Sequence, residues 1–412
     1  MVDVQERATG YEDRSLMESK FRHHWQMDPV AAKELANGIT EEHSAHVDEV
    51  LLDIESYWPA VEKRDRNRDE VRKIFNGESD KQLIIIGPCS LDAETDYTEL
   101  FEYVEQLQGL HPDVVFGVRL NGAKPRSRGG NTGPFLSTIA GRRRKQLDAY
   151  DDAFQRGLAI FTEITDKDQF GRLAPYLTGA WLGARDMGST DLRTVLSATR
   201  LNVLVKNSTD GRLSSLRDAV TSLAKNTEQN EGSGVNFGWL SYSYTHPDGG
   251  PAAITVGEGN PNVALVARGY ELDHEVMDEA GNIKLVSVLT DEEREAKTYE
   301  NLGNICTLAA RLGKIALLDG SHEVPRMLRL GDKTEGSRFL KVLRKFRAAV
   351  RERKIANADR IRGYLGEVSV NAGITDKNLE LTKETKRELA DEFDQFIKLD
   401  ASAHPVEAAL AV

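Results

Sequence analysis

Reactive or charged side chains stand at the ends of a series of short apolar segments in this sequence. They include a thiol, an imidazole, carboxylates and several cations: Cys89, Arg119, Lys124, Glu163, Arg185, Lys206, Arg268, Asp319, His322, Glu367 and Asp376. Parallel strands direct their carboxyl ends to one face of a barrel, where active sites are built from the loops that follow. The spacing therefore predicts that these residues share one site.

Four of these residues form a candidate set of metal ligands. Cys89 and His322 offer a thiolate and an imidazole, and Glu367 and Asp376 offer hard oxygens. Such a mixture suits a divalent transition ion such as Mn, Fe, Co or Zn better than calcium or magnesium. The four ligands come from distant segments, unlike those of a zinc finger, which is typical of a catalytic site with an open position. Taken alone, Cys89 would be interpreted as a small buried apolar residue.

A second group of rim residues is cationic and predicts an anionic ligand. Its members follow different apolar segments: Arg119, Lys124, Arg185, Lys206 and Arg268. Converging cations repel one another unless an anion neutralises them, and guanidinium groups match phosphate and carboxylate well. We expect a substrate that carries both groups. The less favoured interpretation is that Lys206 and Arg268 form structural ion pairs with Glu163 or Asp319.

The apolar segments that carry these residues have the length and composition of buried strands. They occupy residues 83–90, 114–120, 158–164, 180–185, 202–207, 263–269, 314–322 and 360–367, and amphipathic helical patterns separate most of them. Eight such βα units predict an α/β fold, a (β/α)8 TIM barrel. The long interval before the sixth strand predicts an inserted hairpin at 239–244 and 252–256. A doubly wound open sheet is disfavoured because no G-x-G-x-x-G motif follows any strand.

Composition and charge indicate which partners and which cellular compartment to expect. The chain has 412 residues, 40% of them hydrophobic, and a net charge of -12. This charge argues against nucleic acid and anionic membranes as partners. Two cysteines and an acidic N-terminus without an apolar core predict a cytoplasmic protein. We expect an N-terminal helical extension over 1–78 for oligomerisation or regulation, a catalytic barrel over 79–400 and a tail over 401–412.

Collinear motifs in the chain resemble those of class I DAHP synthases. These motifs are IIIGPCS, R-x4-KPR, FTEITD, LGAR, VKNSTDG, VARG, LLDGSH and GE followed by AGITD. Their order extends from about residue 67 to residue 376. The resemblance implies a (β/α)8 barrel that condenses phosphoenolpyruvate with an aldose phosphate, usually erythrose 4-phosphate, in aromatic amino acid biosynthesis (the shikimate pathway). It also implies a homo-oligomer, either a dimer or a tetramer.

The resemblance further implies a role for each matching residue. The metal ligands would be Cys89, His322, Glu367 and Asp376. Phosphoenolpyruvate would be held by Arg119, Lys124, Arg185, Lys206 and Arg268, with Ala184 nearby. Lys124, Pro125 and Arg126 would also border the aldose phosphate. The catalytic group would comprise Lys124, Glu163, Lys206 and His322, with Glu163 near the bridging phosphate and water.

Departures from the family pattern leave the acceptor open. Asn121 and Ala123 replace an aromatic and an acidic residue, and the loop over 127–146 differs in sequence, as do residues 270–298. The basic run Arg142–Arg144 at a predicted helix start offers an alternative phosphate site. A related enzyme with a different aldose acceptor is therefore the first alternative. A non-catalytic regulatory barrel is the second. Cys306 is interpreted as a core residue, and Trp181 as a packing or interface residue.

Overall fold

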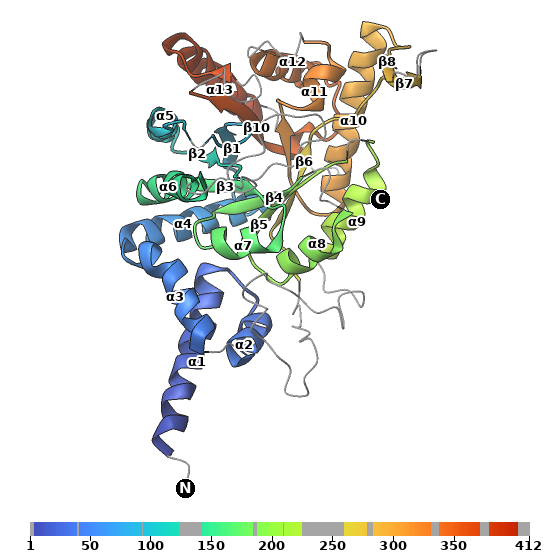
Figure 1. Ribbon diagram of the computed structural model, residues 1–412. Helices are drawn as coiled ribbons and strands as arrows, with labels where there is room; N and C mark the ends of the chain where they lie inside the picture. Colours follow the sequence, from blue (N-terminus) through green and yellow to red (C-terminus); the bar gives the residue numbers. More distant parts are fainter. Residues whose placement is uncertain are drawn as a thin grey trace.

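The fold is that of a computed structural model, which describes residues 4–38, 41–92, 94–122, 142–183, 188–208, 210–224, 259–277, 283–330, 338–370 and 379–402. Its barrel strands are β1 (Gln82–Gly87), β2 (Val114–Arg119), β3 (Ala159–Glu163), β4 (Gly179–Leu182), β5 (Asn202–Lys206), β6 (Val263–Ala267), β9 (Ala316–Asp319) and β10 (Ile361–Ser369). They pair in parallel in that order, and β10 pairs with β1 to close the barrel (Figure 1). The predicted (β/α)8 barrel is confirmed.

Helices surround this barrel in alternation with the strands. They are α5 (Thr98–Leu110), α6 (Arg142–Gln155), α7 (Lys167–Leu173), α8 (Thr190–Ser197), α9 (Leu213–Ala224), α10 (Asp291–Arg311), α11 (Glu323–Met327), α12 (Arg338–Arg351) and α13 (Lys383–Ser402), with the 3-10 turn η4 (Ala358–Arg360) before β10. The local sequence explains where several of these helices begin. Asp166 and Ser189 cap α7 and α8, and Thr290 forms a capping box with Glu293 at α10. None of the helices in the described segments has the length and hydropathy needed to cross a membrane.

The interior of the barrel is a separate apolar cluster from the layer between strands and helices. Phe161, Trp181, Leu204 and Leu317 contribute to it from different strands. The Phe161 ring lies against Gly117 and Gly179 of the neighbouring strands, where any Cβ would clash with it. Small residues beside a large ring thus let the interior reach close packing.

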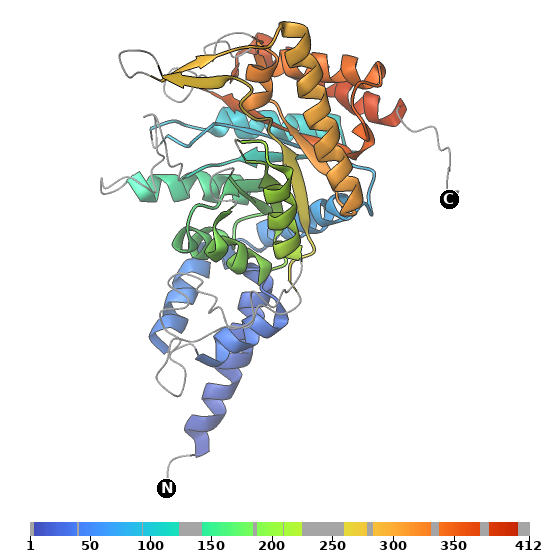
Figure 2. The same cartoon turned by 90° about the vertical axis from the view of Figure 1, so that its right-hand side faces the viewer.

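Four helices precede the barrel: α1 (Val4–His24), α2 (Pro29–Gly38), α3 (Glu41–Glu55) and α4 (Trp58–Phe75). Helices α1–α3 protrude from one side of the barrel in both views (Figures 1 and 2). Helix α4 differs from them, because its Val71, Ile74 and Phe75 side chains belong to the interior cluster of the barrel. The predicted extension over 1–78 therefore includes one helix that packs against the barrel interior.

Two strands form a hairpin outside the barrel, after its sixth strand. They are β7 (His274–Met277) and β8 (Ile283–Val286), which pair antiparallel. The predicted hairpin at 239–244 and 252–256 lies outside the described residues. The β7–β8 hairpin falls within the segment 270–298, where charge obscured the alternation of its apolar residues. A short strand β11 (Leu379–Glu380) extends the sheet beside β10.

Candidate active site

The carboxyl ends of the barrel strands bring together most of the predicted site residues that the structure describes. Arg119, Glu163 and Lys206 are the last residues of β2, β3 and β5, and Asp319 is the last residue of β9. Cys89, Arg268 and His322 follow β1, β6 and β9, and Glu367 lies within β10. The predicted side chains at Lys124, Pro125, Arg126, Ala184, Arg185 and Asp376 lie outside the described residues. Arg142–Arg144 begin α6, but their side chains also lie outside this set.

A continuous chain of ion pairs and hydrogen bonds crosses this rim. Arg119 Nη2 lies 2.8 Å from Glu367 Oε1, which is 3.4 Å from His322 Nε2. His322 Nδ1 lies 2.8 Å from Asp319 Oδ2, and the same oxygen is 3.1 Å from Lys206 Nζ. The side chains of Arg119 and Asp319 have no exposed surface. Low dielectric strengthens each interaction in such a buried chain.

Protein carboxylates neutralise each described rim cation, which the sequence interpretation had considered the less favoured case. Lys206 pairs with Asp319, and Arg268 Nη2 lies 3.5 Å from Glu323 Oε1. For Arg268 the partner is Glu323 and not one of the two predicted carboxylates. The physical reason is that a buried cation without a counter-ion is costly. Charge repulsion among the cations therefore does not by itself require an anionic ligand.

Hydrogen-bond donors at the rim are nevertheless left over. The Nε and Nη1 atoms of Arg119 are buried without a hydrogen-bond partner among the described residues, as is Nη1 of Arg268. Buried donors are nearly always paired in native proteins, by protein, water or ligand. Planar guanidinium donors of this kind match the oxygens of carboxylate and phosphate. The geometry thus provides places for anion oxygens at the rim.

Trp181 of β4 lies among the candidate site residues, although the sequence interpretation gave it only a packing or interface role. Its ring centroid lies 5.3 Å from Arg119 Cζ and 5.3 Å from Lys206 Nζ. A ring below two cations stabilises both through its quadrupole and fixes their positions. Its position within the strand, an inward-facing one, was the only signal in the sequence. Trp181 is fully buried, in agreement with the packing interpretation.

Asn121 connects the first three strand ends. It is fully buried, its side-chain amide donates to Cys89 O at 3.0 Å, and its Oδ1 accepts from Glu163 N at 3.0 Å. Arg119 Nη2 also donates to Cys89 O at 3.2 Å. A Cβ at Gly87 would clash with the Arg119 carbonyl, so glycine permits this close approach of β1 to β2. The departure from the family pattern at Asn121 thus has a local structural role.

The imidazole of His322 has the state and geometry of a metal ligand. Burial lowers its pKa to about 4, with Lys206 contributing in the same direction. Burial alone would raise the pKa of Asp319, but His322 and Lys206 hold that pKa well below its usual range. A neutral imidazole bonded at Nδ1 to a carboxylate presents its Nε2 lone pair to a metal.

Two of the four predicted metal ligands lie side by side in the part of the chain that the structure describes. His322 Nε2 and Glu367 Oε1 face each other at 3.4 Å, an imidazole nitrogen beside a carboxylate oxygen. Cys89 is buried at the same rim. Within the described segments no three His, Cys, Asp or Glu side chains gather closely enough to hold a metal. The fourth predicted ligand, Asp376, is not among the described residues.

Cys306, the other cysteine, is buried in α10, and burial raises its pKa to about 12, as expected of a core residue.

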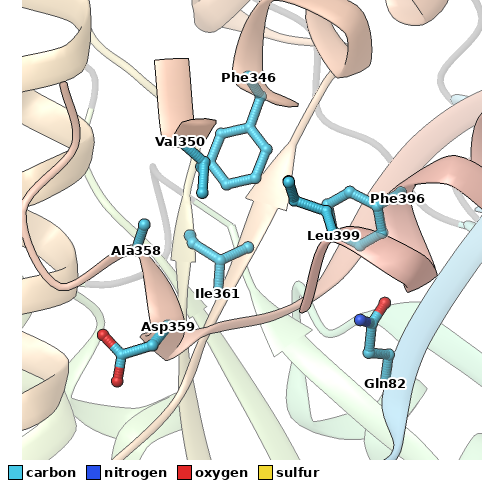
Figure 3. A pocket seen from close by; sticks show the side chains of 8 residues that line it. All are labelled: Gln82, Phe346, Val350, Ala358, Asp359, Ile361, Phe396 and Leu399. Atoms are coloured by element: carbon cyan, nitrogen blue, oxygen red, sulfur yellow. The ribbon is translucent and has the colours of Figure 1, made fainter. Parts of the chain in front are cut away.

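A small cleft at the opposite end of the barrel does not have the features of an active site. It lies where α12, α13 and η4 meet the first residues of β1 and β10 (Figure 3). Its lining is largely apolar and consists of Gln82, Phe346, Val350, Ala358, Asp359, Ile361, Phe396 and Leu399. The candidate residues at the strand ends lie at the other face of the barrel.

Known proteins resemble the chain in sequence and fold. The Trp-sensitive phospho-2-dehydro-3-deoxyheptonate aldolase of Escherichia coli (strain K12) is 27% identical over 221 residues, covering 49% of this chain and 57% of that protein. The tyrosine-inhibited phospho-2-dehydro-3-deoxyheptonate aldolase of Candida albicans is 28% identical over 218 residues, covering 50% of this chain and 54% of that protein. The chain thus spans little more than half the length of these curated relatives.

A solved structure supports the same fold over a greater length. Phospho-2-dehydro-3-deoxyheptonate aldolase from Francisella tularensis SCHU S4 superposes with a TM-score of 0.61 at 19% identity, covering 88% of this chain and 97% of that one. The model of the DAHP synthetase I family matches residues 54–288, more than half of the chain. Given this match and the collinear motifs at the barrel rim, the chain belongs to the DAHP synthetase I family.

Proposed function

We propose that this protein catalyses a metal-dependent condensation of phosphoenolpyruvate with an aldose phosphate. The products would be a 3-deoxy-2-keto sugar acid phosphate and inorganic phosphate. Family membership supports the reaction class. The observation that carries the proposal is the set of buried guanidinium donors at Arg119 and Arg268 that lack partners among the described residues.

The rim residues would hold phosphoenolpyruvate by its two anionic groups. Arg119 and Arg268 would donate to carboxylate or phosphate oxygens, and Lys206 would add a point charge beside them. From the resemblance, we assign Lys124, Arg185 and the Ala184 amide to the same ligand. Trp181 beneath Arg119 and Lys206 supports this assignment, because it restricts both cations to one place.

Cys89, His322, Glu367 and Asp376 would hold the divalent metal, for which Mn, Fe, Co and Zn are the candidates. When bound, such an ion supplies Lewis acidity that polarises the aldehyde oxygen. The adjacency of His322 and Glu367 supports the assignment. His322 would contribute Nε2, since Asp319 already engages Nδ1.

The remaining chemistry falls to the protein side chains. C3 of phosphoenolpyruvate would form a bond to the aldehyde carbon, and positive charge would develop at C2. Water would add at C2 and give one proton to the alkoxide formed from the aldehyde oxygen. The C2–O bond to phosphate would then break as the C2 carbonyl forms, and the second proton of the water would pass to the departing phosphate. Glu163, the last residue of β3, would orient that water, while Lys206 and the arginines would stabilise the departing phosphate.

The acceptor that we favour is erythrose 4-phosphate, held in part by Lys124, Pro125 and Arg126. The alternative is a different aldose phosphate, bound by the divergent loop over 127–146 and by Arg142–Arg144 at the start of α6. The N-terminus of that helix favours a phosphate group in either case.

One assay separates these possibilities. Purified protein is stripped of metal, reloaded with single divalent ions and tested for phosphate release from phosphoenolpyruvate with four-, five- and six-carbon aldose phosphates. We expect release that requires metal and is fastest with erythrose 4-phosphate. Faster release with a longer aldose would support the alternative acceptor. No release with any metal and aldose would instead support a non-catalytic barrel.

Substitution of the predicted thiolate ligand tests the metal site separately. Cys89→Ser should bind metal far more weakly while it keeps its fold, because a hydroxyl is a poor ligand for a soft ion. The matched control is Cys306→Ser, which changes the other buried cysteine in α10. Metal content is measured by elemental analysis. Normal metal content in Cys89→Ser would exclude the assigned ligand.

We also propose that the chain forms a homo-oligomer through its N-terminal helices. Large apolar side chains are exposed there, with Leu16 52%, Leu52 69% and Trp58 53% accessible. These exposed side chains on the N-terminal helices support the proposal of a contact surface there. A Leu16→Lys/Leu52→Lys variant should have a smaller mass by light scattering than the native chain. An unchanged oligomeric mass would contradict this role.

A further inference from the structure

Asp319 is a buried carboxylate on which three donors converge. It ends β9 and has no exposed surface. Ser321 N donates to its Oδ1 at 3.0 Å, and Lys206 Nζ donates to its Oδ2 at 3.1 Å. His322 Nδ1 lies 2.9 Å from Oδ1 and 2.8 Å from Oδ2. The two oxygens therefore serve a backbone amide, an ammonium and an imidazole together.

This arrangement determines which nitrogen of His322 carries the proton. An ionised carboxylate only accepts hydrogen bonds, so Nδ1 must be the protonated nitrogen. The lone pair then resides on Nε2, the atom that faces Glu367 Oε1 at 3.4 Å. The ring is held in the orientation that a metal ligand needs.

The same carboxylate determines where the Lys206 ammonium lies. Lys206 is 3% exposed and lies between Asp319 and the Trp181 ring, at 3.1 Å and 5.3 Å respectively. A lysine side chain loses considerable rotamer freedom in such a position. Asp319 thus offsets the burial of this charge and fixes its position beside Arg119.

We propose that Asp319 is a positioning residue that couples the two halves of the site, orienting His322 toward the metal and Lys206 toward the anionic substrate. This inference rests on the proposed function. It predicts that one substitution, at a residue touching neither ligand, weakens the binding of both.

Asp319→Asn is an informative change because it preserves shape but removes one acceptor. An amide has a single acceptor oxygen, whereas three donors need to be satisfied here. Its NH2 group must face Ser321 N, Lys206 or His322 Nδ1. Facing the imidazole, it would donate to Nδ1 and move the ring proton to Nε2, which removes the lone pair from the metal side.

The experiment measures both affinities directly on the full chain. Mn²⁺ affinity is measured by competition with a chromophoric chelator in the absence of substrate, and phosphoenolpyruvate affinity by calorimetry at saturating Mn²⁺. We expect Asp319→Asn to weaken metal binding by roughly 10–100-fold, the range for partners of metal-bound histidines, and phosphoenolpyruvate binding by about tenfold or more. The control is Asp359→Asn, at the opposite end of the barrel, which should leave both affinities within about twofold of native. A folded Asp319→Asn protein with both affinities unchanged overturns the inference, and so does a loss of one affinity alone.

A second pair of variants covers the case in which Asp319→Asn does not fold. Lys206→Met should weaken phosphoenolpyruvate binding but leave Mn²⁺ affinity within about threefold, because Asp319 still engages His322. Asp319→Ala/Lys206→Met removes both charges and leaves no buried charge unpaired, which protects the fold. We expect it to bind Mn²⁺ roughly tenfold more weakly than Lys206→Met. Equal Mn²⁺ affinities in the two variants would overturn the role of Asp319.

The affinities of the native chain distinguish a failure of the proposed function from a failure of the positioning role of Asp319. A native chain that binds neither Mn²⁺ nor phosphoenolpyruvate contradicts the proposed function, and the inference is rejected with it. A native chain that binds both, with variants that bind equally well, contradicts only the positioning role.

Discussion

Arg68 and Arg119 are buried arginines at opposite ends of the barrel, and their guanidinium groups are satisfied very differently. Arg68 of α4 donates from all three nitrogens to the carbonyls of His23, His24, Ala174 and Leu177. Arg119 donates to one carbonyl and pairs with Glu367, while its Nε and Nη1 lack partners among the described residues. Arg68 therefore has no donor left over, whereas Arg119 keeps two donor nitrogens that are available to a ligand.

Two tryptophans repeat this contrast. Trp25 and Trp181 are both fully buried, and Trp25 Nε1 donates to Gly171 O at 2.8 Å. The Nε1 of Trp181 has no partner among the described residues, and its ring lies below two cations. Burial alone therefore does not separate structural from functional residues. The two tryptophans differ in the hydrogen bonding of their indole nitrogens.

The largest effect that we expect is a loss of stability at Arg68. Arg68→Met leaves several buried carbonyls without donors and should lower the free energy of unfolding by about 3–5 kcal/mol. Urea denaturation followed by circular dichroism measures it. A change in the free energy of unfolding below about 1 kcal/mol would show that the hydrogen bonds of Arg68 contribute little to stability.

Substitution of the rim arginine, Arg119, should weaken the use of phosphoenolpyruvate and leave the fold intact. Arg119→Lys keeps a charge beside Glu367 but loses the planar donors, so kcat/KM for phosphoenolpyruvate should fall by a factor that corresponds to about 1.5–3 kcal/mol. Arg68→Lys is the matched control and should leave this constant unchanged in the folded protein. If both lysine variants changed kcat/KM equally, the contrast between the two arginines would be wrong.

Acidic pH should destabilise the metal-free protein through two buried histidines, His24 and His322, which lie at opposite ends of the barrel. Burial lowers the pKa of His24 to about 2, aided by Arg64, and burial lowers the pKa of His322 to about 4. The unfolded chain therefore binds protons below pH 6.5 before the folded chain does, so stability falls as the pH drops below this value. Between pH 6.5 and pH 5 each histidine should contribute at most about 2 kcal/mol.

Urea unfolding at pH 7 and pH 5 measures this difference. His24→Gln should remove about half of the pH dependence and leave the part due to His322. Equal stability of the native chain at both pH values would show that neither histidine has the lowered pKa.

The smallest effect concerns the two tryptophans. Trp181→Leu removes the ring below Arg119 and Lys206, and its KM for phosphoenolpyruvate should rise by a factor that corresponds to about 0.5–2 kcal/mol. Trp25→Leu should lower the melting temperature and leave KM unchanged. The same shift in KM for both variants would indicate a general effect of core packing.

The sequence was sufficient to predict the barrel and the rim at which most of the described candidate residues meet. Buried β-branched runs such as 83–86 separated by amphipathic helices specify parallel βα units, and topology then places residues such as Arg119 and Lys206 on one rim. The predicted helix start at Arg142 is likewise confirmed, because α6 begins there.

The pairing of rim residues could not be predicted in this way. Lys206 meets Asp319 and Arg268 meets Glu323 through contacts that depend on the relative heights of β5, β6 and β9 at the rim. Local patterns do not encode such heights. For the same reason, the role of α4 in the barrel interior and of Trp181 below the cations became evident only in three dimensions.

The most direct test of the central claim is a crystal structure of the protein with Mn²⁺ and phosphoenolpyruvate. We predict that carboxylate or phosphate oxygens of the ligand lie about 2.7–3.2 Å from Arg119 Nε and Nη1 and from Arg268 Nη1. We also predict Mn²⁺ bound by His322 Nε2 and Glu367. A ligand bound elsewhere on the barrel, with these guanidinium nitrogens still unpaired, would contradict the account.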